Sequence, residues 1–299
     1  MTSRIRQATR KHTNELAAAA VAPHAAVQGR SAIERVRLAR HPSRPQALDY
    51  LQDLFREFFE IHGDRRYADD GAIVAGLAYF DKLPVAVVGE QRGRSTADRL
   101  KRNFGKPHPE GYRKAARVYE LAERFRLPLI TFIDTQGAES GIGAEERGQT
   151  EAIAHNLELM ARLMVPSIAC VIGEGSSGGA LALGVANVVL IQENACYTVI
   201  TPEGCAAILW REATEENVAR AADALRLSAP DLLRLGVVDE IIGEPEGGAH
   251  TSPTEAIAAV GEAIRRHLND LMKLSPAEVR KARECKFAAM GSAFLTSSI

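Results

Sequence analysis

The stretch that decides the fold is Val165-Pro-Ser-Ile-Ala-Cys-Val-Ile172 followed by Gly173-Glu-Gly-Ser-Ser-Gly-Gly-Ala180. A nearly continuous apolar run, typical of a buried strand, leads into four glycines within seven residues, and a helical pattern starts at once. Glycines let the backbone approach a ligand closely, and a helix N-terminus presents unpaired N–H groups with partial positive charge. The stretch therefore predicts a turn suited to an anion, either a bound phosphate or an oxyanion that develops during a reaction.

Several interpretations of this turn compete. A phosphate-binding P-loop requires a lysine after the last glycine, and none follows Gly179. The pattern Gly175-Ser-Ser177-Gly-Gly179 matches the GxSxG of a nucleophile elbow, and Asp239 and His250 follow in hydrolase order, so a serine hydrolase stays open. A third interpretation is a backbone oxyanion hole formed by Gly178 and Gly179 without any side-chain nucleophile. A purely structural turn is the remaining alternative.

Two further segments favour an anion site. Residues 134–149 form a second glycine-rich loop between an apolar run and a helical pattern. Because both loops follow buried strands, we expect them at one edge of the sheet, where ligands bind in such folds. Residues 92–117 carry nine basic side chains against Asp98 and Glu110, a local net charge of +7. This segment is either an anion-facing surface or a solvated helix face.

Composition excludes other classes. The 299 residues contain 37 Lys and Arg against 38 Asp and Glu, a net charge of -1, which argues against general nucleic-acid binding. No apolar run is long enough to span a membrane, and the basic N-terminus lacks the apolar core of a signal peptide. The four cysteines form no CxxC pair and so no zinc-site spacing. We expect a cytoplasmic protein with an arm over residues 1–30 and one domain over 31–299.

Hydrophobic periodicity predicts alternating strands and helices, and therefore an α/β domain with right-handed crossovers. Strands are expected over 72–80, 83–88, 127–133, 165–172, 188–191 and 195–200. Helices are expected over 31–41, 46–62, 111–125, 144–163, 178–185, 221–227, 229–235, 253–271 and 276–290. Asp81 and Lys82 are expected to form a hairpin turn between the first two strands.

Longer motifs run in order along nearly the whole chain from Arg40 onward. They include Ala39-Arg-His-Pro-Ser-Arg-Pro45, His62-Gly-Asp-Arg65, Arg102-Asn-Phe-Gly105, Pro109-Glu-Gly-Tyr-Arg-Lys-Ala115, Gly141-Ile-Gly-Ala-Glu-Glu-Arg-Gly-Gln149, Thr201-Pro-Glu-Gly-Cys-Ala206 and Lys286-Phe-Ala-Ala-Met-Gly291. Together they resemble the carboxyltransferase α subunit of bacterial acetyl-CoA carboxylase. So many motifs in register are far more specific than one glycine turn.

The resemblance implies a crotonase-like (ClpP/crotonase) ββα superhelix with additional N- and C-terminal helices. It implies an α2β2 heterotetramer, active only with a β subunit that carries the zinc, and no metal in this chain. The reaction it implies is the first step of fatty acid synthesis: the carboxylate of carboxybiotin, held on a biotin carboxyl carrier protein, moves to acetyl-CoA or a related acyl-CoA. Loss of CO2 leaves a ureido anion that removes the acetyl proton, and the enolate recaptures CO2.

The site residues follow from the same resemblance. The N–H groups of Gly178 and Gly179 are expected to hold the biotin ureido oxygen, while the β subunit holds the enolate. The residues expected to line the biotin pocket are Gly137, Ala138, Gly141, Gly175 and Ser177. The arginines expected to approach the CoA phosphates are Arg92, Arg94, Arg99 and Arg102.

One loop departs from the family pattern. The family usually has Pro-Gly-Ala-Tyr-Pro here, whereas this chain has Gln136-Gly-Ala-Glu139-Ser140. We interpret this as the exchange of a stiff aromatic wall for a flexible acidic one. It leaves open a specialised paralogue for another acyl group and a subunit with weakened biotin binding. A stand-alone acyl-CoA hydrolase or decarboxylase and a non-catalytic scaffold also remain as alternatives.

Overall fold

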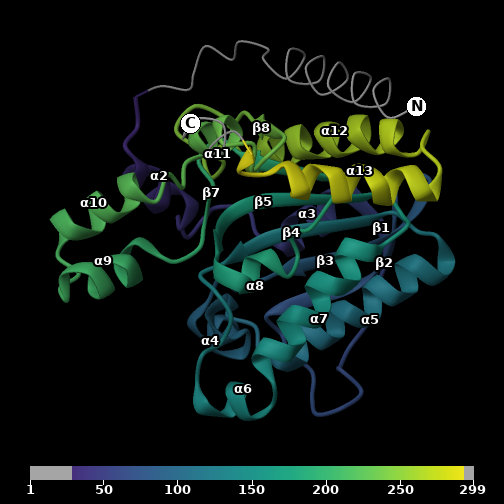
Figure 1. Ribbon diagram of the computed structural model, residues 1–299, viewed down its shortest axis with the longest axis horizontal. Coiled ribbons are helices and arrows are strands. Elements are labelled where there is room, and N and C mark those ends of the chain that lie inside the picture. Colours follow the sequence, from purple (N-terminus) through teal and green to yellow (C-terminus); the bar gives the residue numbers. More distant parts are fainter. Residues whose placement is uncertain (1–28, 293–299) are drawn as a thin grey trace.

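The computed structural model describes residues 29–292, so the expected arm lies almost entirely outside the described residues. Its centre is one eight-stranded sheet with the order β1-β2-β3-β4-β5-β6-β8, and β7 pairs with β5 off this path (Figure 1). The strands are β1 (Phe55–Glu60), β2 (Ile73–Phe80), β3 (Leu83–Glu90), β4 (Leu129–Thr135), β5 (Ser167–Ser176), β6 (Val188–Gln192), β7 (Cys196–Thr198) and β8 (Glu240–Ile242). The first three strands are antiparallel, and all later pairings are parallel. The predicted α/β class is thereby confirmed.

Helices cover both faces of this sheet, and in Figure 1 α12 lies above it while α5 and α7 lie below. The helices are α2 (Ala32–Ala39), α3 (Ala47–Leu54), α4 (Thr96–Lys101), α5 (Pro109–Phe125), α6 (Ile142–Glu146), α7 (Gln149–Arg162), α8 (Ser177–Leu181), α9 (Pro202–Trp210), α10 (Glu215–Ala224), α11 (Ala229–Arg234), α12 (Pro253–Leu271) and α13 (Pro276–Ala289), with a 3-10 turn over Asn103–Gly105. None of the helices within 29–292 is both long and apolar enough to cross a bilayer.

Each face of the sheet has its own hydrophobic core because side chains alternate along a strand. On β4, Ile133 faces the core built with α5 and α7, which contains Tyr112. Its neighbour Phe132 faces the opposite core, built with α3 and α12, which contains Tyr50. All seven residues of β4 and all ten of β5 are buried, so the two central strands give the following loops a rigid base.

Two sequence predictions about helices are wrong. The helix predicted over 46–62 ends at Leu54, and the next six residues form β1, in which Phe55 pairs with Phe80 of β2. Their helical spacing of phenylalanines is overridden because edge pairing buries Phe55 against Phe80. The helix predicted over 144–163 is split at Gly148, whose φ of +83° ends α6 and starts α7. The predicted Asp81 turn, with φ +54°, is confirmed.

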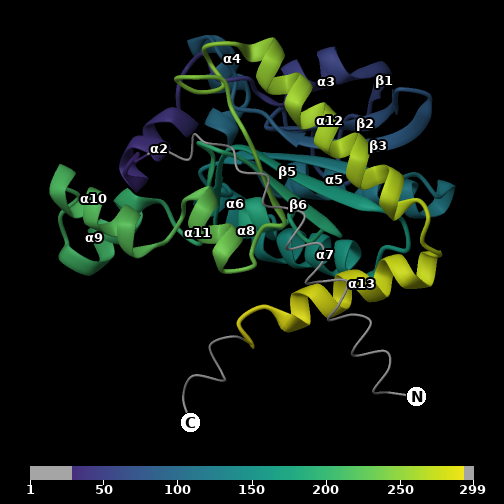
Figure 2. The same ribbon diagram turned by 90° about the horizontal axis from the view of Figure 1, so that it is seen from above.

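A helical arm formed by α9 and α10 projects from the body in both ribbon views (Figures 1 and 2). It was only partly predicted, since α9 has no clear amphipathic period. Arg40 joins it to the sheet, pairing with Glu203 of α9 at 2.6 Å and with Glu174 of β5 at 2.6 Å. The arm is therefore held next to the end of β5, where the glycine turn begins.

Candidate active site

The two glycine-rich loops meet at the carboxyl ends of β4 and β5, as predicted. These strands are parallel neighbours, and Thr135 is paired with Gly175. The contact between the loops is tight: a Cβ added at Gly179 would lie 2.6 Å from the Ala138 nitrogen and 3.0 Å from the Gly137 carbonyl carbon. Only glycine allows the turn to approach the second loop this closely.

The turn leaves backbone donors free. Helix α8 starts at Ser177, so the first N–H groups of the helix have no partner one turn earlier. Within residues 29–292, no acceptor receives a hydrogen bond from the N–H of Gly178 or of Gly179. Gly178 is partly exposed and Gly179 is buried. Two adjacent free donors at a helix N-terminus are what an oxyanion hole requires.

Buried charges fix the strands that lead into the turn. Asp134, at the end of β4, pairs with Arg92 at 2.8 Å and accepts a hydrogen bond from the Glu174 backbone nitrogen at 3.0 Å. Burial raises the pKa of Asp134, and the positive charge of Arg92 opposes that rise. Glu174 in turn accepts two hydrogen bonds from Arg40. These contacts tie the ends of β4 and β5 together just before the two loops.

A buried polar group lies behind the turn and was not predicted. Glu90 accepts a hydrogen bond from the Asp134 backbone nitrogen at 3.0 Å, and its second carboxyl oxygen has no partner. Burial raises the pKa of Glu90 well above its usual range, which favours the neutral form of this carboxyl. The hydroxyl of Tyr112, also buried without a partner, lies 2.6 Å from the position of a Gly179 Cβ. Residue spacing gives no signal for such a cluster.

The predicted pocket residues divide into two groups. Gly137 and Ala138 lie against the turn, as expected. A Cβ added at Gly175 would meet Tyr197 at 2.9 Å and Ile133 at 3.1 Å, so a side chain at this position would face the core, and the place of Gly175 in the pocket wall stays a prediction. Gly141 is exposed and lies at the N-terminus of α6.

The nucleophile-elbow alternative finds no partners in the structure. Ser177 is exposed and has a φ of +63°, but no hydrogen bond in the described part of the chain joins its hydroxyl to a base. Asp239 pairs with Lys286, and His250 stacks on His41 with ring centroids 3.7 Å apart. A Ser-His-Asp arrangement is therefore not assembled around Ser177.

Five of the nine basic side chains of residues 92–117 form ion pairs within the described part of the chain. Arg92 is buried against Asp134, Arg94 pairs with Asp49 at 2.5 Å, and Arg102 pairs with Asp98 at 2.7 Å. Arg113 and Lys114 are also buried and paired with aspartates. Among the four arginines expected near CoA, only Arg99 has no ion pair within residues 29–292. The charge of the segment is therefore divided, among the described residues, between internal ion pairs and unpaired side chains, and its contact with an anion stays a prediction.

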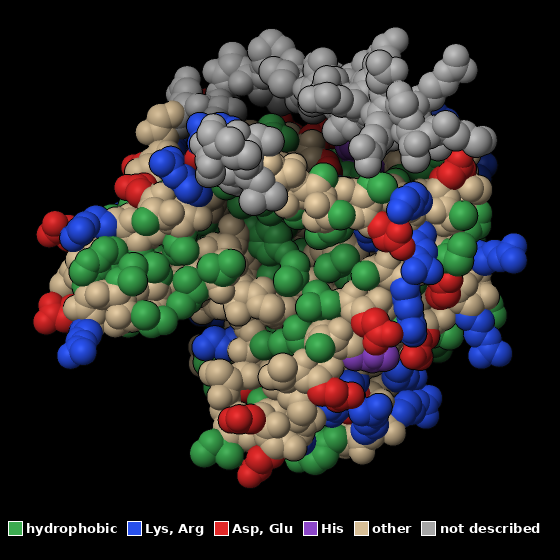
Figure 3. Space-filling model, viewed as in Figure 1, with side chains coloured by type: hydrophobic (Ala, Val, Ile, Leu, Met, Phe, Trp, Pro, Cys, Tyr) green, Lys and Arg blue, Asp and Glu red, His purple; other side chains and the backbone are tan. Residues whose placement is uncertain are grey.

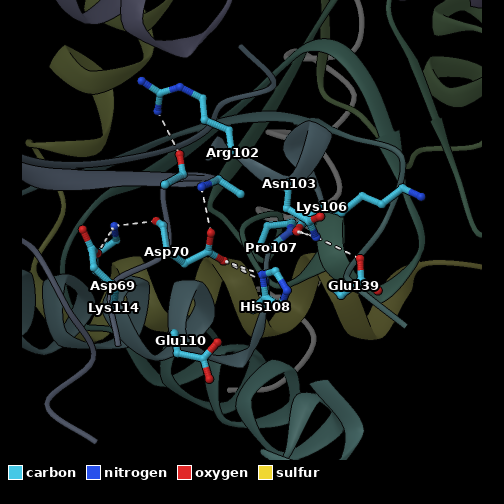
Figure 4. Close-up of polar contacts among 12 residues, drawn as sticks. Asp69, Asp70, Arg102, Asn103, Lys106, Pro107, His108, Glu110, Lys114 and Glu139 are labelled. Carbon is cyan, nitrogen blue, oxygen red and sulfur yellow. Dashed lines mark hydrogen bonds and ion pairs between the residues drawn. The ribbon is translucent and has the colours of Figure 1, made fainter. Parts of the chain in front are cut away.

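The loop that departs from the family pattern is held by hydrogen bonds (Figure 4). One carboxylate oxygen of Glu139 accepts from the Asn103 amide at 2.8 Å, and the other accepts from the Gly141 backbone nitrogen at 2.8 Å. The hydrogen bond from Asn103 is the main reason that the pKa of Glu139 is lowered. The loop keeps an acidic side chain at Glu139, and two hydrogen bonds hold its carboxylate in place.

A sheet of mostly parallel strands flanked by helices, with two glycine-rich loops at the carboxyl ends of its central strands, defines the class of crotonase-fold proteins. Two solved structures share the fold. Transcarboxylase 12S, with methylmalonyl-coenzyme A bound, has a TM-score of 0.61 and 20% identity over 83% of this chain and 46% of its own. A Pseudomonas malonate decarboxylase hetero-tetramer in complex with coenzyme A has a TM-score of 0.61 and 18% identity over 79% of this chain and 91% of its own.

Within this class, the chain belongs to the acetyl co-enzyme A carboxylase carboxyltransferase-like family, which it matches over residues 5–291. The acetyl-coenzyme A carboxylase carboxyl transferase subunit alpha of Aquifex aeolicus is 57% identical over 259 residues, covering 87% of this chain and 80% of the relative. The protein of the same name from Deinococcus radiodurans is 49% identical over 297 residues, covering 96% and 93%. The expected family and crotonase-like fold are thereby confirmed.

Proposed function

We propose that this chain is the α half of a carboxyltransferase that moves the carboxyl group of carboxybiotin to acetyl-CoA and gives malonyl-CoA. The observation that carries the proposal is the pair of free N–H groups at Gly178 and Gly179, packed against Gly137 and Ala138 in a chain of this family. The relatives from Aquifex aeolicus and Deinococcus radiodurans carry the name of that activity.

The turn offers backbone N–H donors, and the ureido oxygen of biotin is an acceptor that becomes negatively charged during the reaction. Carboxybiotin, brought by a biotin carboxyl carrier protein, supplies the carboxyl group and, once CO2 has left, the base for the acetyl methyl group. The N–H groups of Gly178 and Gly179 donate to the ureido oxygen and stabilise its negative charge. Each such donor contributes about 2.7–4 kcal/mol to transition-state stabilisation. The backbone of Gly137 and Ala138 holds the turn in place without adding a competing acceptor charge.

The proposal requires a second subunit for the acyl-CoA. We assign the enolate of the thioester and the zinc to a β subunit in an α2β2 heterotetramer that works in the cytoplasm. Support comes from the α9–α10 arm and the segment that leads into it: Ile208 and Leu209 of α9 are 72% and 61% exposed, and Val199, between β7 and α9, is 77% exposed. Figure 3 shows hydrophobic side chains over this arm beside a hollow in the surface. Exposed apolar groups of this kind mark a protein interface. Arg99 is the remaining candidate of this chain for a CoA phosphate.

The test is carboxyl transfer run backwards. The full chain, alone and co-expressed with a candidate β subunit, receives malonyl-CoA and free biotin, and acetyl-CoA formation is followed. Activity only in the mixture is the expected result, and it should be abolished by Gly178→Val without loss of the complex. Activity of the lone chain would point to a stand-alone hydrolase or decarboxylase. An inactive but stable complex, tested with a series of acyl-CoA esters, would indicate a scaffold.

A further inference from the structure

Four hydrogen bonds meet at Glu139 in the loop over residues 136–140, and two of them join the loop to the segment over residues 103–107. Its carboxylate accepts from the Asn103 amide and from the Gly141 backbone nitrogen, each at 2.8 Å. Its backbone nitrogen donates to the Pro107 carbonyl at 2.9 Å, and its carbonyl accepts from the Gln149 amide at 2.8 Å. We call the contact between Asn103 and Glu139 the clasp (Figure 4).

The partner side of the clasp is itself anchored. The Asn103 amide also donates to the Lys106 carbonyl at 3.0 Å, and Arg102 donates to the Gly71 carbonyl at 2.8 Å. Asn103 and Phe104 both have left-handed backbone conformations, with φ of +43° and +55°. Non-glycine residues adopt this region at a cost and keep it only where the surroundings hold them. Asn103 therefore presents its amide from a fixed position.

The loop that the clasp holds is the one that supports the oxyanion turn. The Gly137 nitrogen donates to the Thr135 hydroxyl at 3.0 Å, and that hydroxyl donates to the Gly105 carbonyl at 2.6 Å. The Gly137–Ala138 peptide then lies against Gly179 at the distances of a close backbone contact. Because Glu139 follows Ala138 directly in the chain, a displacement of the loop at Glu139 also moves the Gly137–Ala138 wall. Each of these links is short and buried or half-buried.

We propose that Glu139 is a positioning residue: through Asn103 it holds the Gly137–Ala138 wall against the oxyanion turn and so sets how tightly the site binds the ureido group. The inference rests on the proposed function for the identity of that group. The side chain acts through the loop and touches no reacting atom. Hydrogen bonds to an ionised carboxylate are stronger than neutral ones, so the clasp adds to the backbone hydrogen bonds that Glu139 makes with Pro107 and Gln149.

The experiment compares Glu139→Ala, Asn103→Ala and the double variant in the complex of the full chain with its β subunit. Each single variant should raise KM for free biotin about tenfold while KM for malonyl-CoA stays unchanged, because the lost hydrogen bond is to a charged carboxylate and is only partly buried. The double variant should lie close to Glu139→Ala and well below the product of the two single effects, because both changes remove the contact between Asn103 and Glu139 and the double variant loses in addition only the hydrogen bond to the Lys106 carbonyl. Glu139→Gln should give a KM for biotin between those of the unaltered chain and Glu139→Ala. Glutamine keeps an acceptor for the Gly141 nitrogen but presents a donor to the Asn103 amide. Glu145→Ala, an exposed acid on α6, is the matched control and should leave both constants unchanged.

Hydrogen exchange of the isolated full chain separates this inference from the proposed function. The amides of residues 137–141 should exchange faster in Glu139→Ala and Asn103→Ala than in the unaltered chain, even if the complex has no carboxyltransferase activity. Unchanged exchange rates in both variants would contradict the claim that the clasp holds the loop. Faster exchange with an unchanged KM for biotin would overturn its role in positioning the site. Equal losses toward biotin and malonyl-CoA would show a merely structural role and would also overturn it.

Discussion

A methyl group added to Gly179 tests whether the contact between the two loops controls the reaction. In Gly179→Ala the new Cβ would lie 2.6 Å from the Ala138 nitrogen and 2.6 Å from the Tyr112 hydroxyl. Alanine keeps the N–H, and Gly179 does not have a positive φ, so neither the donor nor backbone strain is at issue. The perturbation is therefore purely one of distance.

The size of the effect follows from the geometry. To reach an ordinary contact of 3.4 Å, the two loops must separate by roughly 0.8 Å, and a misplacement of about 1 Å in a reacting site costs about 10²-fold in rate. Overpacking of this kind also lowers the free energy of unfolding by about 1–3 kcal/mol. We expect kcat of the reverse reaction to fall about 10²-fold while the complex still assembles.

Gly178→Ala is the matched control on the adjacent residue. Its Cβ would lie 3.5 Å from Ile153, an ordinary van der Waals contact, and it also keeps its N–H. Activity should change less than about threefold, which corresponds to well under 1.4 kcal/mol. Steady-state kinetics and thermal unfolding of both variants make the comparison. If Gly179→Ala is folded and as active as Gly178→Ala, the argument from loop contact is refuted.

Three further outcomes are expected. Ser177→Ala should keep activity within about twofold, because the turn acts through backbone donors; a loss of about 10³-fold in kcat would instead indicate a nucleophile. In the unaltered protein the free energy of unfolding should fall as the pH rises above about 4.5, because the native Glu90 carboxyl keeps a proton that the unfolded chain releases, and Glu90→Gln should reduce this fall. Urea unfolding between pH 5 and 9 measures the free energy of unfolding of both proteins, and an identical dependence on pH would contradict the raised pKa of Glu90. Arg40→Met leaves Glu174 as an unpaired buried charge and should lower the free energy of unfolding by about 3–5 kcal/mol. Arg94→Met breaks an exposed ion pair and should lower it by at most about 1 kcal/mol, and equal losses in the two variants would contradict a dependence on burial.

The sequence was sufficient where local pattern and tertiary environment agree. Apolar runs that contain no polar alternation become buried strands in almost any α/β domain, and for that reason 127–133 and 165–172 were found as β4 and β5. Four glycines between a strand and a helix leave free N–H groups for local steric reasons, so Gly178 and Gly179 were singled out from the residues alone. The motifs in register gave the family.

Other features depended on residues far apart in the chain. Phe55–Glu60 became a strand because β2 offered an unpaired edge, and no periodicity within those six residues records that edge. The charges of residues 92–117 could not be assigned from their own segment, since their partners include Asp64 and Asp134. Glu139 looked like a loose acid until the fold placed Asn103 beside it.

The sequence by itself determined the α/β class, the family, the central strands and the glycine turn, because each of these depends on the spacing of nearby residues or on contiguous motifs. Only the tertiary structure decided which charged side chains have no ion pair, which glycines lie between the two loops, and which polar groups lie buried behind the turn. The physical reason is that burial and ion pairing depend on the distance between atoms brought together by folding, and the order of residues along the chain does not fix that distance.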